Sequence, residues 1–250
     1  MNGESKFRIK DLIVSLVVGE IAAWLLFVLT KGILPPATYQ KYLSIIKLLP
    51  IIFPIICAVA LYVAFLIGKK IAIIYQIAKF ILIGGLNTLV DWGILALLIF
   101  IFRSSFGVLS GDTWLTVFSL TIAFYSLYKA ISFVLAATNS YIWNKFWTFK
   151  RESTEKVGKE FLQFLLVTLI GFLINVVIAS GIFKMISPLG GLNADQWAIG
   201  AAVVATAVSM IWNFIGYKFI VFEQKKPEVE SQPGDSQSFG QSQPPGRKII

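Results

Sequence analysis

The chain has 250 residues, of which 57% are apolar and only 14% charged, whereas a soluble domain carries roughly 25% charged residues. Its 22 Lys and Arg outnumber its 13 Asp and Glu, and it has one cysteine and no histidine. This composition excludes a disulfide framework, a thiol metal cluster and a serine–histidine triad, and it favours lipid as the solvent for most of the surface.

A membrane-spanning helix needs about 20 mostly apolar residues. Six runs have this property in chain order: residues 11–30, 48–68, 80–102, a part of 114–147, 161–183 and 197–222. The fourth run is longer than one span needs, so we expect residues 106–123 to form an apolar outer loop. The pattern predicts an all-α polytopic membrane helix bundle with about six transmembrane helices.

Lysine and arginine concentrate in alternate connecting segments, beginning with the segment before the first run. By the positive-inside rule these segments face the cytoplasm, so both termini are expected there, in a multi-pass protein of the inner membrane. The basic excess then faces anionic lipids rather than nucleic acid. Residues 224–250 are rich in Gln, Ser, Gly and Pro and are predicted to form a disordered cytoplasmic tail.

The apolar runs contain an internal repeat. The pattern Lys-Phe-x-x-Phe closes the fourth run at residues 145–149 and the sixth run at residues 218–222. The third and fifth runs each carry glycine shortly before asparagine. Runs three and four therefore repeat as runs five and six, in a parallel repeat about an axis along the membrane normal.

Residues 80–91 (Phe-x-x-x-Gly-Gly-Leu-Asn-Thr-x-x-Asp) and 144–149 (Asn-Lys-Phe-Trp-Thr-Phe) resemble the GtrA-like family of small membrane proteins. The resemblance implies three parts: two extra N-terminal transmembrane helices in 1–76, a four-helix GtrA-like domain in 77–223, and the tail in 224–250. It also implies a role in cell-surface polysaccharide synthesis, either moving polyprenyl-phosphate-linked sugars across the membrane or assisting the glycosyltransferase that makes them.

Two acids fall at mid-membrane depth. Asp91 lies ~18 Å beyond Lys79 at 1.5 Å per residue, and Asn87 lies one turn earlier on the same face, within hydrogen-bonding reach. Asp91 either lines a path for a sugar headgroup or a coupling ion, or forms a neutral clasp between helices. Glu20 lies ~15 Å beyond Lys10, and the two acids either share a cavity or are unrelated.

Basic and aromatic side chains gather at the expected inner surface. The candidates for binding a lipid phosphate there are Lys145, Trp147, Lys150, Arg151 and Lys218, with Lys129 as the counterpart near the outer surface. The alternative is that these residues are ordinary interfacial anchors.

Four amides lie in or near the spans: Asn139, Asn144, Asn175 and Asn213. They can hydrogen-bond sugar hydroxyls, or they can join helix to helix, a contact worth about 0.6 kcal/mol on average.

The first hypothesis for function is translocation, or flipping, of an undecaprenyl-phosphate-linked sugar. The second is a non-catalytic membrane subunit that anchors or stabilises a polyprenyl-phosphate glycosyltransferase. The third is an ion-coupled small-solute transporter that uses Glu20 and Asp91. No enzymatic activity, metal or cofactor is expected. The expected partners are the lipid-linked sugar and anionic lipids, with a membrane glycosyltransferase or a second copy of the chain as further candidates.

Overall fold

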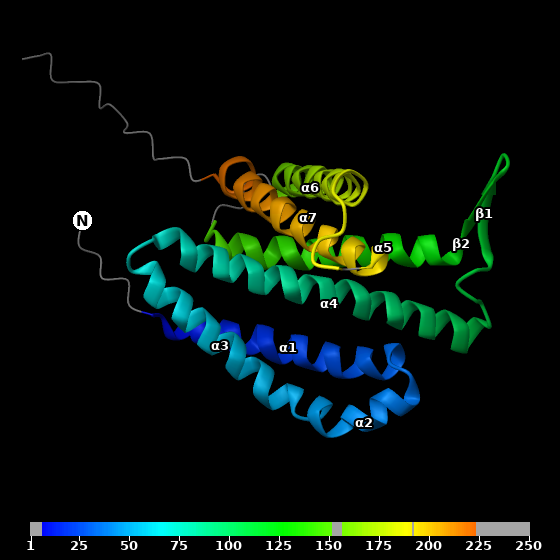
Figure 1. Ribbon diagram of the computed structural model, residues 1–250, viewed down its shortest axis with the longest axis horizontal. Helices are drawn as coiled ribbons and strands as arrows, with labels where there is room; N and C mark the ends of the chain where they lie inside the picture. Colours follow the sequence, from blue (N-terminus) through cyan, green and yellow to red (C-terminus); the bar gives the residue numbers. More distant parts are fainter. Residues whose placement is uncertain (1–6, 152–156, 192, 224–250) are drawn as a thin grey trace, which may run out of the picture.

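The structure is a computed structural model that describes residues 7–151, 157–191 and 193–223. It confirms the predicted polytopic helical membrane bundle (Figure 1). The helices are α1 (Ile9–Ile33), α2 (Pro36–Ile46), α3 (Leu49–Gly68), α4 (Ala72–Phe106), α5 (Phe124–Trp143), α6 (Val157–Met185) and α7 (Ala194–Gly216). Two π-helical turns, η1 (Asn144–Thr148) and η2 (Tyr217–Val221), continue α5 and α7. The predicted tail lies outside the described residues.

Five helices are long and apolar enough to cross a membrane: α1, α3, α4, α6 and α7 extended by η2. The expected fourth span is α5, which has 20 residues but falls outside this set. Its polar side chains lower its hydropathy, and several of them face protein: Ser132 and Ser140 are buried. Helix α5 runs back alongside α4 (Figure 1). Because α5 is not among the five apolar helices, its membrane crossing stays a prediction.

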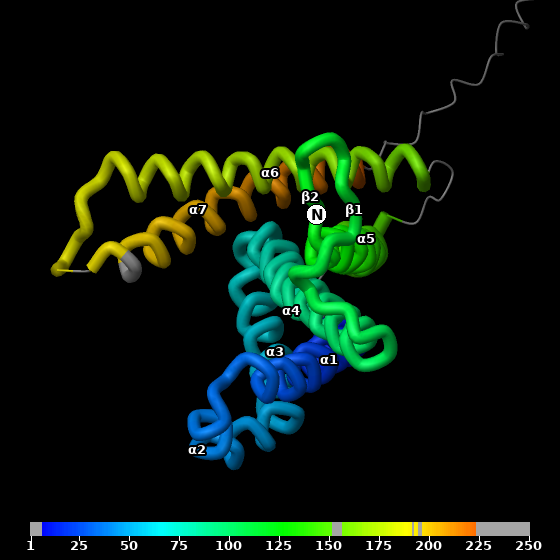
Figure 2. Tube along the Cα trace, turned by 90° about the vertical axis from the view of Figure 1, so that its right-hand side faces the viewer, coloured from blue at the N-terminus to red at the C-terminus, as the bar shows by residue number. Residues whose placement is uncertain are grey.

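The connection between α4 and α5 contains a β-hairpin in place of the expected loop. Strands β1 (Thr113–Val117) and β2 (Leu120–Ala123) pair antiparallel. Helix α4 ends at Gly107, whose φ of 68° is the left-handed conformation that glycine adopts without strain. The hairpin then projects from the end of the bundle opposite the start of α1, turned to the side on which α6 and α7 lie (Figures 1 and 2).

The helices form antiparallel pairs, α1 with α3, α4 with α5 and α6 with α7. In Figure 1, α4 and α5 run lengthwise while α6 is seen nearly end-on. In Figure 2, α6 runs lengthwise while α5 is seen nearly end-on. The α6–α7 pair therefore crosses the α4–α5 pair steeply. An aromatic cluster joins the two pairs, with Phe80 packed on Phe214 at 5.6 Å and Phe149 stacked on Phe222 at 5.2 Å between ring centroids.

The two helix pairs end in the same local structure, as the internal repeat predicts. Each closing Lys-Phe-x-x-Phe segment forms a π-helical turn. The amide of Phe149 donates to the Asn144 carbonyl at 2.8 Å, and the amide of Phe222 donates to the Tyr217 carbonyl at 2.8 Å. Such wide turns are rare in proteins, and those that occur often lie at functional sites. The surface between the two repeats is therefore a candidate functional surface.

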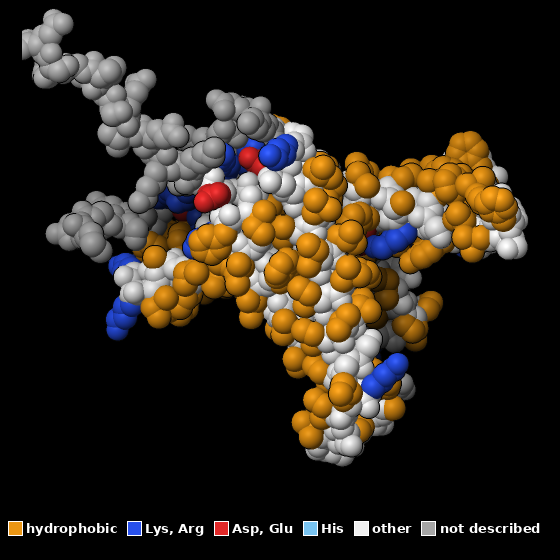
Figure 3. Space-filling view, turned by 90° about the horizontal axis from the view of Figure 1, so that it is seen from above, with side chains coloured by type: hydrophobic (Ala, Val, Ile, Leu, Met, Phe, Trp, Pro, Cys, Tyr) orange, Lys and Arg blue, Asp and Glu red, His pale blue; other side chains and the backbone are white. Residues whose placement is uncertain are grey.

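The surface distribution of side chains fits a lipid environment. Hydrophobic side chains cover most of the face in Figure 3, and basic and acidic side chains gather mainly at the end where α1 begins. Residues as apolar as Val177 and Met185 are 69% and 86% exposed. In water this would be unfavourable, but in a bilayer these side chains contact acyl chains.

A buried ion pair fastens the N-terminal helices to the rest. Lys79 on α4 is 2% exposed, and its Nζ lies 2.5 Å from Oδ1 of Asp11 on α1. The indole N–H of Trp147 donates to the same oxygen at 2.9 Å. Because removing one partner leaves an uncompensated buried charge, this pair is costly to break.

We predict that Lys79→Met lowers the free energy of unfolding by about 3–5 kcal/mol, because Asp11 loses its buried counter-charge. Thermal unfolding of the purified protein in detergent measures the change. The matched control is Lys70→Met, since Lys70 is exposed. Adding Asp11→Asn to Lys79→Met should restore part of the loss, and equal stability of Lys79→Met and Lys70→Met would contradict the assignment.

Candidate functional site

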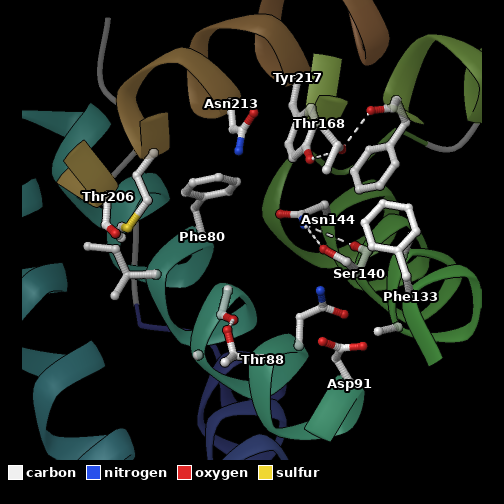
Figure 4. Close-up of a pocket in the computed structure, with 18 residues that line it drawn as sticks. Phe80, Thr88, Asp91, Phe133, Ser140, Asn144, Thr168, Thr206, Asn213 and Tyr217 are labelled. Atoms are coloured by element: carbon white, nitrogen blue, oxygen red, sulfur yellow. Dashed lines mark hydrogen bonds between the residues drawn. The ribbon is translucent and has the colours of Figure 1, made fainter. Parts of the chain in front are cut away.

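A cavity of about 550 Å³ lies between the α4–α5 pair and the α6–α7 pair (Figure 4). Its volume falls in the range of small-molecule sites, about 300–1,000 Å³. Helix α4 contributes Phe80, Ile81, Gly84, Gly85, Asn87, Thr88 and Asp91, and α5 with η1 contributes Phe133, Ala136, Ala137, Ser140 and Asn144. Helices α6 and α7 with η2 contribute Phe164, Thr168, Thr206, Met210, Asn213 and Tyr217. The cavity is thus built from both repeats.

Three of the predicted amides meet in this cavity. Asn87, Asn144 and Asn213 each have a buried Oδ1 that accepts no hydrogen bond in the structure. The orientation of Asn144 is fixed by its Nδ2, which donates to the Ser140 carbonyl at 2.9 Å. Unpaired buried polar atoms cost free energy, so three such amides beside one cavity could hydrogen-bond a polar ligand there.

Aromatic rings surround these amides. Phe80, Phe133, Phe164 and Tyr217 line the cavity (Figure 4). Tyr217 stacks on Phe164 at 4.3 Å between centroids, and its hydroxyl lies 2.7 Å from Thr168 Oγ1. These contacts hold the rings in place. The arrangement offers apolar faces beside hydrogen-bond acceptors, which suits a ring that has both C–H and O–H groups.

Asp91 also lines the cavity and is held by α5. Its carboxylate forms an ion pair with Lys129 and accepts a hydrogen bond of 2.7 Å from Ser132 Oγ. Asp91 thus joins α4 to α5, but through an ion pair instead of the expected neutral carboxyl, and no hydrogen bond to Asn87 is formed among the described residues. A charge pair lowers the cost of both groups in lipid. A role of Lys129 in binding phosphate near the outer surface stays a prediction.

The predicted phosphate-binding cluster separates into two groups. Lys145 is 1% exposed, and its Nζ lies 2.6 Å from Glu160 Oε1, which also accepts the Tyr141 hydroxyl at 2.6 Å. Arg151 Nε lies 3.8 Å from the same carboxylate. With Trp147 bonded to Asp11, these residues join α1, η1 and α6 and lie outside the cavity lining.

Lys218 and Lys150 form the second group. Among the described residues, neither has a carboxylate within ion-pair distance. Lys218 follows Tyr217 of the cavity, and Lys150 is exposed. Partial desolvation lowers the pKa of Lys150 from its usual value, and the like charge of Arg8 acts in the same direction. A phosphate beside either lysine would supply the missing negative charge.

The remaining predicted residues lie elsewhere. Asn175 donates to Thr206 Oγ1 at 3.3 Å and to Ser209 Oγ at 3.4 Å, and so joins α6 to α7. Asn139 accepts the Trp143 indole N–H at 3.2 Å. Glu20 lines a separate cavity between α1 and α4, so of the two alternatives for the mid-depth acids the structure favours the one in which they are unrelated.

Sequence reasoning missed Ser140, Thr168, Thr206 and Tyr217 as lining residues. The repeat could have identified two of them. Aligning Lys145 with Lys218 pairs Ser140 with Asn213 and Asn144 with Tyr217, so equivalent positions line the cavity from both halves. Thr168 and Thr206 carried no such signal, because hydroxyls on spans commonly bond their own backbone, as both do here.

A family model described as GtrA/DPMS, transmembrane domain, matches residues 79–222. The chain is also similar to the "Uncharacterized membrane protein YngA" of Bacillus subtilis (strain 168), with 28% identity over 163 residues, or 64% of this chain and 87% of that protein. No solved structure gives a significant match. The family match confirms the predicted resemblance, contains the whole cavity lining and leaves α1, α2 and α3 outside its range.

We predict that Gly171→Ala destabilises the protein, because the added methyl group would fall within van der Waals distance of the Asn213 amide and force it to move. Overpacking of this kind costs about 1–3 kcal/mol. Thermal unfolding in detergent measures the change. The control is Gly181→Ala on the same helix, where nothing lies within 4 Å of the new methyl group. A neutral Gly171→Ala would contradict the close contact of α6 with α7.

Proposed function

Because the chain belongs to the GtrA/DPMS transmembrane-domain family, we propose that it carries a sugar linked to a polyprenyl phosphate, such as undecaprenyl phosphate, across the inner membrane. The role is non-catalytic and serves cell-surface polysaccharide synthesis. The lysine-rich end at which the described chain begins and ends faces the cytoplasm in this proposal, as the positive-inside rule favours.

The observation that carries the proposal is that three amide side chains with an unpaired Oδ1, those of Asn87, Asn144 and Asn213, line one cavity. A sugar presents several hydroxyl donors in a small volume, and its ring carbons pack on aromatic faces. Water-free hydrocarbon offers no acceptors for those hydroxyls, so the headgroup is costly to move through lipid alone. The cavity supplies acceptors at membrane depth and so lowers this cost.

The phosphate has its partners at the basic end. Lys218 adjoins the cavity through Tyr217, and Lys150 follows η1 on the other repeat. A phosphate at headgroup level beside either lysine gains a cationic neighbour, whereas Lys145 is occupied by Glu160. The polyprenyl chain stays in lipid beside the exposed apolar faces of the helices.

We predict that Asn213→Ala and Asn144→Ala each slow transport about threefold to tenfold, since each removes one hydrogen-bond acceptor worth about 1 kcal/mol. The assay follows a short-chain polyprenyl-phosphate hexose across liposomes that contain only this protein. Asn139→Ala is the matched control, because this amide lies on α5 outside the cavity lining. Failure of the wild-type protein to exceed protein-free liposomes, with copurification of a glycosyltransferase, would replace transport by the subunit role.

We also predict that Lys218→Gln raises the substrate concentration for half-maximal transport several-fold, because the phosphate loses a cationic partner. Lys41→Gln on exposed α2 is the control. High salt should weaken wild-type binding more than that of Lys218→Gln. An unchanged concentration dependence would remove Lys218 from the site.

A further inference from the structure

A second cavity lies on the opposite face of α4 from the cavity between the two helix pairs. It has a volume of about 940 Å³ and is formed by α1 and α4. Helix α1 contributes Glu20, Ile21, Trp24, Leu25, Val28, Leu29, Lys31 and Gly32, and α4 contributes Gly93, Ala96, Leu97 and Phe100. At 100° per residue, Gly93 and Leu97 point away from Asn87 and Asp91, so the two cavities are separated by the body of α4.

Glu20 lies in this cavity at mid-membrane depth. It is eleven residues beyond the start of α1 at Ile9, or ~16 Å, where the hydrocarbon core is about 30 Å thick. Its contact is with Trp24, whose indole N–H donates to Oε1 at 2.8 Å. A carboxylate at this depth is expensive unless it has a positive partner or takes up a proton.

Three other acids on the membrane helices show how this cost is usually met. Asp11, Asp91 and Glu160 each form an ion pair with a lysine of another helix. Within the described residues, Glu20 has no such lysine or arginine. Lys31 borders the same cavity, but it lies ~16 Å along α1 at the far end. The charge of Glu20 therefore lacks a partner from the described part of the chain.

The walls around Glu20 define what can reach it. Apart from Glu20 and Lys31 they are aliphatic, aromatic or glycine, and Trp24 and Phe100 are 51% and 66% exposed on the lipid-facing surface. A ligand must therefore enter from lipid and be mostly apolar. It must also carry a positive charge to complement the carboxylate, and an aromatic ring beside the charge favours an organic cation further.

We propose that this cavity binds a lipophilic organic cation, with Glu20 as its counter-charge and Trp24 as the aromatic wall beside it. The proposal is independent of sugar transport, because it uses a different cavity and α1, which lies outside the family match.

The test is equilibrium dialysis of tetraphenylphosphonium against the purified full chain in detergent. The expected result is saturable binding that falls about tenfold or more in Glu20→Gln, whose side-chain oxygen can still accept the Trp24 hydrogen bond. Asp112→Asn, in the segment before the hairpin, is the matched control and should bind as the wild type does. Tetraphenylborate has the same shape and opposite charge and, dialysed in a separate experiment, should show no saturable binding.

Two outcomes would overturn the proposal. One is binding that does not saturate and is equal in wild type and Glu20→Gln, which would reflect partition into the micelle. The other is the absence of saturable binding to the wild-type protein, which would show that Glu20 has no cationic ligand in this cavity. Thermal unfolding of Glu20→Gln confirms that the variant is folded, and its sugar transport should remain at the wild-type rate.

Discussion

Pairing of buried lysines with carboxylates from other helices is the constraint on which this structure depends. In a surrounding of low dielectric constant an isolated charge is expensive, so each pair fixes which helices meet and at what depth. Lys79 with Asp11 joins α4 to α1, and Lys145 with Glu160 joins η1 to α6. Both pairs lie at the basic end, where the aromatic cluster also holds the two repeats together. Away from that end the repeats diverge, and the cavity lies between them.

The polar residues of the spans have two structural roles. Side chains with charged partners hold helices together, whereas amides with unpaired oxygens surround a space. Asp91 belongs to both groups, because it borders the cavity while Lys129 and Ser132 hold its carboxylate. A headgroup in the cavity would therefore meet a carboxylate and an amide, that of Asn144, whose positions hydrogen bonds already hold, which reduces the reorganisation that binding requires.

Much of the fold could be predicted from the sequence, because span length and hydrophobicity follow directly from the thickness of the bilayer. The repeat was visible in the two Lys-Phe-x-x-Phe segments, and the equivalent positions that it pairs, Ser140 with Asn213 and Asn144 with Tyr217, line the cavity from both halves. The partners of the lysines could not be predicted, since an ion pair such as Lys145 with Glu160 depends on how the helices pack in three dimensions. Helix α2 and the β-hairpin were missed because short apolar segments between spans have no distinctive periodicity.

The π-helical turns set the rotational phase of each closing segment. A backbone bond from one residue to the fifth before it accommodates one more residue than an α-turn, and one residue corresponds to about 100° of rotation. The rings that follow η1 and η2 are thereby directed to the same point, where Phe149 stacks on Phe222. Because η1 and η2 are both five-residue π-helical turns, the two closing segments are rotated by the same amount. Shortening only one of the segments by a single residue would swing its ring out of register and separate the halves at their shared end.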